Sequence, residues 1–111
     1  MGNPHNPEHN HVTFHVLVDG KEKTYSGVGP ARAVDCVEAI WRVVSKEPGV
    51  RSQDVQQIYS EWEPAGEDLK FLDATFPDSA QLGYTFARPR DGHWAAALAA
   101  AAKTIETSSD E

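Results

Sequence analysis

A short strand that runs through a proline turn into a helix is the feature that most constrains the fold of this chain. Residues 55 to 62 place isoleucine, tyrosine and tryptophan in a strand pattern, and Pro64 follows at once. Glu67 and Asp68 come next, where the first turn of a helix favours negative charge. We therefore expect a helix over residues 65 to 75. A strand followed by a helix indicates a crossover connection, which joins parallel strands of one sheet.

Two further strands precede this unit. Residues 12 to 18 alternate apolar side chains with others, which predicts a strand with one apolar face. Asp19-Gly20 is a favoured hairpin turn. Residues 21 to 26 are more polar and charged, which suits the edge of a sheet.

Helical spacing of apolar residues predicts a helix over residues 31 to 45, with Pro30 suited to its first turn. Residues 82 to 87 form a further strand pattern, and residues 93 to 106 an alanine-rich helix. The order is strand, strand, helix, strand, helix, strand, helix. This order predicts an α/β fold, a three-layer α/β/α arrangement around a mixed sheet of about four strands.

The expected core consists of the apolar positions that repeat on one face of each element. In the helices and the last strand these are Val34, Val37, Trp41, Val44, Leu69, Leu72, Phe76, Leu82, Tyr84 and Phe86.

Length and composition restrict the class of protein. The 111 residues suffice for one small domain, which we place at residues 12–106, between a polar, disordered lead at 1–11 and a frayed tail at 107–111. The net charge of −7 opposes nonspecific binding to nucleic acid, and only Arg88 with Arg90 could form a local basic pocket. No apolar run approaches the ~20 residues that span a bilayer. The single cysteine, with no visible secretory signal, suits a cytoplasmic protein.

Several segments carry a resemblance to a known family, and together they extend from about residue 12 to residue 102. They are Tyr25-Ser26-Gly27, Cys36-Val37-Glu38, Ile58-Tyr59-Ser60-Glu61-Trp62-Glu63-Pro64, Phe76-Pro77 and Leu82-Gly83-Tyr84-Thr85-Phe86. With the order of elements, they resemble the cytidine-deaminase-like superfamily, in particular the nucleic-acid deaminases found as toxin domains in bacterial conflict systems. The strand–Glu-Pro–helix junction is the most distinctive of them.

The resemblance implies a zinc site that this sequence has lost in part. In that family a His-x-Glu supplies one zinc ligand and a general acid/base, and a Pro-Cys-x-x-Cys supplies two more ligands. The resemblance places Cys36 at the histidine, Glu38 at the catalytic glutamate, Ala65 at the first cysteine and Asp68 at the second. A thiolate or a carboxylate can bind zinc, whereas alanine has no donor atom. The resemblance thus implies a vestigial pocket that would hold zinc weakly, if at all, through Cys36 and Asp68.

Each of these residues also has a structural explanation. Cys36 lies on the apolar arc of its helix, where a lone cysteine packs as a small hydrophobic side chain. Glu38 stands four residues before Arg42, a favourable spacing for an ion pair on a helix. Asp68 lies in the first turn of its own helix, where it complements the helix dipole.

Glu61 and Glu63 form a second candidate pair in the vestigial pocket. They alternate with Trp62, so we expect them on the strand face opposite the indole. Paired carboxylates can perform acid/base chemistry if burial raises one pKa. Two hydrated glutamates at a strand end are the structural alternative.

Two functions follow from this reading. The first is a catalytically degenerate deaminase-like domain without a cofactor, which acts as a binding or interaction module for a protein partner, in the setting of a bacterial conflict system. The alternative is an active zinc-dependent deaminase of nucleobases or nucleic acids with an altered metal site. It would use Cys36, Asp68 and a third ligand such as His93, with Glu38 as proton shuttle.

Overall fold

One mixed sheet organises the molecule. The computed structural model describes residues 8–90 and 93–109, with side chains up to Lys103. The strands are β1 (His9–Val18), β2 (Lys21–Pro30), β3 (Val55–Trp62) and β4 (Gln81–Phe86), in the order β2-β1-β3-β4. β1 runs antiparallel to both β2 and β3, while β4 runs parallel to β3.

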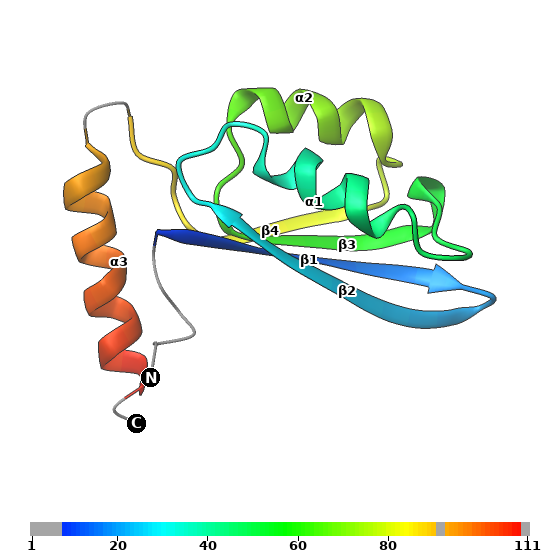
Figure 1. The fold of residues 1–111 in the computed structure, drawn as a ribbon, viewed down its shortest axis with the longest axis horizontal. Helices are drawn as coiled ribbons and strands as arrows, with labels where there is room; N and C mark the ends of the chain where they lie inside the picture. The colour runs from blue at the N-terminus through cyan, green and yellow to red at the C-terminus, as the bar shows by residue number, and fades with distance from the viewer. Residues whose placement is uncertain (1–7, 91–92, 110–111) are drawn as a thin grey trace.

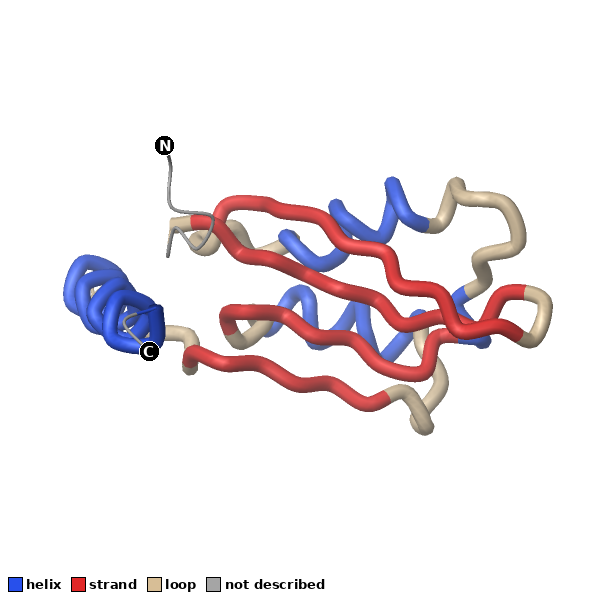
Figure 2. The backbone as a smooth tube through the Cα atoms, turned by 90° about the horizontal axis from the view of Figure 1, so that it is seen from below, coloured by secondary structure: helices blue, strands red, loops and turns tan. Residues whose placement is uncertain are grey.

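The helices lie on one face and at one end of this sheet. α1 (Cys36–Val44) and α2 (Gly66–Thr75) cover the same face, whereas α3 (Trp94–Ser109) stands beyond one end of the strands (Figures 1 and 2). A short 3-10 turn, η1 (Ser52–Asp54), precedes β3. The predicted α/β class with a mixed sheet of four strands is confirmed by the described residues, in which α1 and α2 form one helical layer and α3 lies at the end of the sheet. None of these helices is long and apolar enough to cross a membrane.

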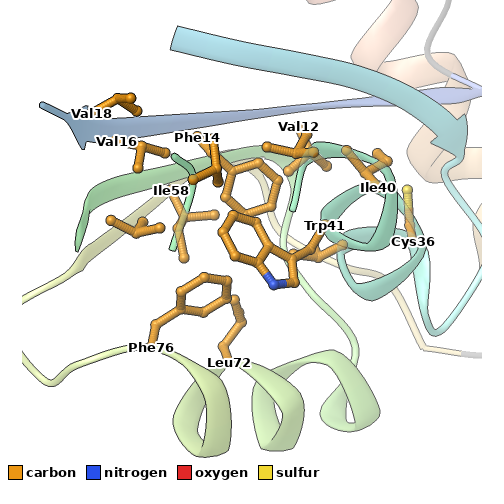
Figure 3. Packing of buried hydrophobic residues seen from close by; sticks show 14 residues of the cluster. Val12, Phe14, Val16, Val18, Cys36, Ile40, Trp41, Ile58, Leu72 and Phe76 are labelled. Atoms are coloured by element: carbon orange, nitrogen blue, oxygen red, sulfur yellow. The ribbon is translucent and has the colours of Figure 1, made fainter. Parts of the chain in front are cut away.

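Three aromatic rings from different elements form the centre of the main core (Figure 3). Trp41 of α1 lies with its ring centroid 5.1 Å from Phe14 of β1 and 4.9 Å from Phe76, which follows α2. Tilted and edge-on contacts between buried aromatic rings stabilise the fold beyond what the burial of their apolar area contributes. The core thus ties α1 and α2 to the middle strands.

Two glycines in β2 allow α1 to lie close to the sheet. A Cβ atom on Gly27 would come within 2.7 Å of Ile40 Cγ2, and one on Gly29 within 2.7 Å of Cys36 Sγ. Larger residues at these positions would push the first turns of α1 away. The glycines therefore set the depth at which Cys36 is placed.

A second cluster attaches α3 to the end of the sheet. Trp94 packs against Trp62 with ring centroids 5.2 Å apart, and Trp62 in turn packs against Phe86 at 5.0 Å. Leu98 and Ala101, one and two turns further along α3, are buried in the same cluster. α3 is thus held through one narrow apolar face.

Several element boundaries differ from those expected. β1 begins at His9 instead of residue 12, because Asn10 is buried and bonded in the core. Residues 1–7 of the expected lead lie outside the described part. Pro30 ends β2, and α1 begins only at Cys36, because Arg88 and a buried aspartate fix the intervening turn and the helix start. α3 extends to Ser109.

The predicted core included several marginal residues that are exposed in the structure. Four side chains predicted to be buried are exposed: Val34, Leu69, Leu82 and Tyr84. Val34 precedes α1, and the other three flank the outer edge of β4. For Leu69, Leu82 and Tyr84, sequence periodicity identified the face of the element but not how far the helices cover it, whereas Val34 lies outside the helix that was expected to contain it.

Candidate functional site

The candidate site lies where the first turns of α1 and α2 meet the carboxyl end of β3. In open α/β sheets, ligands bind preferentially beyond the carboxyl ends of strands. Cys36 and Glu38 open α1, while Ala65 and Asp68 open α2. The residues that the resemblance assigns to a zinc site therefore belong to neighbouring helix starts.

Asp68 caps a helix other than its own. Its Oδ2 atom accepts a hydrogen bond from the Val37 backbone N–H at 2.9 Å, and Oδ1 accepts one from the Glu38 N–H at 3.1 Å. The residue before α1, Asp35, makes no side-chain cap bond. Asp68 of α2 therefore provides the hydrogen-bond acceptors that a local capping residue would otherwise provide for the first N–H groups of α1. Its carboxylate lies close to the positive ends of two helices at once.

Burial dominates the electrostatics of Asp68. The side chain is only 2% exposed, and loss of water raises the pKa of its carboxyl group. The two backbone N–H donors oppose this shift, and the negative charges of Asp35 and Glu38 add to it. Asp68 is therefore protonated more readily in the folded protein than in the unfolded chain.

Asn10 and Ser60 form a buried polar network beside this helix start. The Asn10 amide Nδ2 donates to Ser60 Oγ at 3.0 Å, and its Oδ1 accepts from the Trp62 backbone N–H at 2.9 Å. Ser60 Oγ donates to the Trp62 carbonyl at 2.6 Å. This network joins β1 to the carboxyl end of β3.

Cys36 is the point where the network touches α1. The thiol is 4% exposed, and its Sγ atom accepts from Asn10 Nδ2 at 3.6 Å. Burial raises the pKa of the thiol; the Asn10 bond opposes this shift, and the nearby charge of Asp68 reinforces it. Because the thiolate is the metal-binding form, this environment disfavours ligation.

Glu38 points away from this network. Its carboxylate makes an ion pair with Arg42, one turn further along α1, which confirms the predicted helical spacing. The side chains of both residues are partly or largely exposed. Its backbone N–H, not its carboxylate, joins Glu38 to Asp68.

Ala65 and the two strand-end glutamates complete the predicted pocket. Ala65 is buried at the start of α2 and contributes only a methyl group. Glu63 Oε1 accepts from the Arg88 backbone N–H at 3.1 Å, while Glu61 lies half-buried on β3.

Arg88, treated from the sequence as one half of a basic pair, closes one side of the site. Its Nη2 atom donates to the Arg32 carbonyl at 2.9 Å, and Nη1 to the Ala31 carbonyl at 3.3 Å. The guanidinium also lies over the Trp94 ring, 5.1 Å from its centroid. Arg88 thus links the turn before α1 to α3.

The donor set does not fit a catalytic zinc ion. A catalytic zinc normally has three protein ligands, whereas the described residues contain no group of three or more His, Cys, Asp and Glu side chains placed to hold a metal. Cys36 is bonded to Asn10, and both oxygens of Asp68 are bonded to α1. His93, the suggested third ligand, is exposed at the start of α3.

An open groove of about 340 Å³ adjoins Cys36 between β2 and α1. Its lining is mainly apolar and includes Val28, Ala39, Ile40 and Val43. Such a surface suits contact with apolar groups. Ser26 and Asp35 are the polar side chains of its lining.

Searches against models of protein families, curated proteins and solved structures found no match. The deaminase-like resemblance therefore stays a prediction from the sequence. The function is inferred from the geometry of the residues above.

Proposed function

We propose that this chain is a noncatalytic interaction module with a deaminase-like arrangement of elements, and that it binds a protein partner without zinc. The bonding of Asp68 is the observation that carries this proposal. Both of its carboxylate oxygens already hold the start of α1. A metal would have to compete with those bonds.

The competition is unfavourable. Removing Asp68 from α1 would leave the Val37 and Glu38 N–H groups without acceptors, at about 1–3 kcal/mol for each group that stays buried. Ligation by Cys36 would further require a thiolate in a site where burial raises the thiol pKa. Ala65 offers no compensating bond.

Measurement of the zinc content tests the proposal that the chain functions without bound zinc. Purified protein is exposed to equimolar zinc, dialysed and assayed, and we expect well below one zinc per chain. The Ala65→Cys variant is the matched comparator, because it adds the one missing sulfur and should retain more metal. One firmly held zinc per wild-type chain, lost in Cys36→Ser, would refute the proposal.

The altered zinc enzyme remains the second candidate, and one observation favours it. Asp68 lies near enough to Cys36 for its charge to raise the thiol pKa, so two potential ligands share one neighbourhood. This enzyme predicts deamination of cytosine or adenine in nucleosides, RNA or single-stranded DNA. Product formed by the wild type and not by Glu38→Gln would favour it over the interaction module.

The charge of the chain indicates the chemistry of a partner. A net charge of −7 attracts basic proteins and accelerates their association at low salt. A basic protein of a bacterial conflict system, such as a toxin, fits this requirement. The same charge opposes binding to nucleic acid.

A further inference from the structure

The two edges of the sheet differ in how they are protected. Edge strand β2 carries Lys21, Glu22 and Lys23 and ends at Pro30, and charge and proline are the usual means of preventing further pairing. Edge strand β4 reads Gln-Leu-Gly-Tyr-Thr-Phe, with neither charge nor proline. Only β4 therefore presents an unguarded edge.

The outer side of β4 offers backbone hydrogen-bonding groups. The Phe86 carbonyl accepts from the Glu63 N–H at 2.8 Å, so Phe86 turns its polar backbone atoms toward the β3 side. Backbone groups alternate between the two sides of a strand, which turns those of Gly83 and Thr85 outward. Within the described residues, no strand pairs with this outer side.

A shallow groove of about 270 Å³ accompanies this edge on the helix-covered face. Ile58, Leu72 and Phe76 are among its lining residues, and Leu69 and Leu82 line it while remaining 42% and 41% exposed. Tyr84, next on the same face of β4, is 47% exposed. Within the part of the chain that the structure describes, the edge thus combines backbone groups that no strand pairs with and apolar side chains that are exposed.

Acidic side chains complete the groove. Asp73 of α2 and Asp78 of the following turn line it and are exposed, and no lysine or arginine lines it. A segment that docks here gains from positive charge beside its apolar residues.

We propose that β4 accepts an additional strand from a partner protein, an extended segment whose groove-facing positions, every second residue, carry apolar side chains and a lysine or arginine. Its backbone pairs with Gly83 and Thr85. Side chains at every second position face the groove, where the apolar ones lie beside Leu82 and the basic ones approach Asp73 and Asp78. Addition of a strand to a free edge is an established mode of peptide recognition. This inference rests on the proposed interaction role and specifies the surface that performs it.

A second copy of this chain is a poorer occupant of the same edge. Two copies that pair through β4 would bring chains of charge −7 together, each with an acidic groove. Like charges across an interface oppose association. The charge of the groove therefore selects a basic partner over self-pairing.

Peptide binding followed by backbone amide NMR tests this proposal. The probe is an amidated seven-residue peptide with lysine at its first and last positions, valine or isoleucine at the third and fifth, and threonine between them, so that lysines and apolar residues share one face. The comparator replaces each lysine with glutamate. We expect the lysine peptide to shift and protect amides of β4 and to weaken at least tenfold as salt rises from about 0.05 to about 0.5 M. The glutamate peptide should not bind.

Substitutions assign the binding to the edge. Thr85→Pro removes an outward N–H and keeps the backbone bonds to β3, although it loses the hydroxyl bond to Tyr59. Tyr84→Ala removes exposed apolar surface without touching the backbone. Each should weaken binding about tenfold or more. Val28→Ala, an exposed residue of the other edge strand, is the matched control and should leave binding unchanged.

The charge of the groove is tested in the same way. The double variant Asp73→Asn with Asp78→Asn should weaken the lysine peptide and flatten its salt dependence. Glu47→Gln, an exposed acid after α1, should do neither.

Several outcomes would overturn the inference. These are the absence of shifts at about 1 mM peptide, shifts confined to β2 and α1, equal binding of the glutamate peptide, or dimerisation through β4 without peptide. Binding of the peptide to another surface would refute β4 as the docking site and would leave the proposed interaction role unaffected. A firmly held zinc ion or Glu38-dependent deamination would instead refute the interaction role, whether or not the peptide binds at β4.

Discussion

Replacing Asp68 with alanine removes both acceptors from the start of α1. The Val37 N–H lies in a fully buried position, while the Glu38 N–H is partly buried and can recruit water. An orphaned buried donor is destabilising by about 1–3 kcal/mol, and a partly hydrated one by less. We therefore expect Asp68→Ala to lower the free energy of unfolding by about 2–4 kcal/mol.

Urea unfolding measures this loss directly. With a slope of about 1.5 kcal/mol per molar urea, the midpoint should fall by roughly 1.3 to 2.7 M. Asp73→Ala removes an exposed carboxylate from the same helix and should change stability by no more than about 0.5 kcal/mol. If the two variants unfold alike, Asp68 does not cap α1 and the case against zinc loses its main support.

Asparagine at position 68 separates the hydrogen bond from the charge. Asp68→Asn keeps one acceptor oxygen and no buried charge, so it should lose less stability than Asp68→Ala. Because the folded-state pKa of Asp68 is raised, its protonated form stabilises the fold, and this contribution declines as pH rises through that pKa. The stability of the wild type relative to Asp68→Asn should thus increase as pH falls from neutral, and a pH-independent difference would contradict the burial of this carboxyl.

Three further predictions follow from packing and titration. Gly29→Ala should lower stability by about 1–3 kcal/mol, because its Cβ would meet Cys36 Sγ at 2.7 Å, whereas Gly66→Ala meets nothing within 4 Å and should not; equal urea midpoints would contradict the close approach of α1. The raised pKa of Cys36 means that its contribution to stability is intact below the unfolded-state pKa and is lost as pH rises through the folded-state pKa. Alkaline unfolding should therefore begin at higher pH in Cys36→Ala, and rapid alkylation of the native thiol at neutral pH would argue against its burial. Asn10→Ala should reduce stability by about 1–3 kcal/mol, because it leaves the Trp62 N–H without its acceptor, and amide exchange at Trp62 should accelerate.

The sequence predicted the order of elements because each carries a clear period and its own turn signals. Alternation in β1 and the Asp19-Gly20 turn identified the hairpin, and Pro64 marked the start of α2. The ion pair of Glu38 with Arg42 followed from spacing along one helix. These features are local, so the residues that determine them are close together in the chain.

The interior of the candidate site could not be read in this way. Asp68 caps a helix that begins 32 positions earlier in the numbering, at Cys36, and Arg88 reaches the carbonyls that precede that helix. Such contacts depend on how elements cross in space, and residue types alone do not encode them. Asn10 was the exception, since it continues the alternation of Val12, Phe14 and Val16 and could have been placed on the buried face.

The attachment of α3 has a spectroscopic consequence. Trp41 lies in the main core, while Trp62 and Trp94 lie together where α3 meets the sheet. Undocking of α3 would expose the indoles of Trp62 and Trp94 to water and leave Trp41 buried. In a Trp41→Phe protein, tryptophan fluorescence would come only from the junction of α3 with the sheet. A red shift of this fluorescence at urea concentrations that leave the far-ultraviolet circular dichroism unchanged would show that α3 undocks before the sheet unfolds.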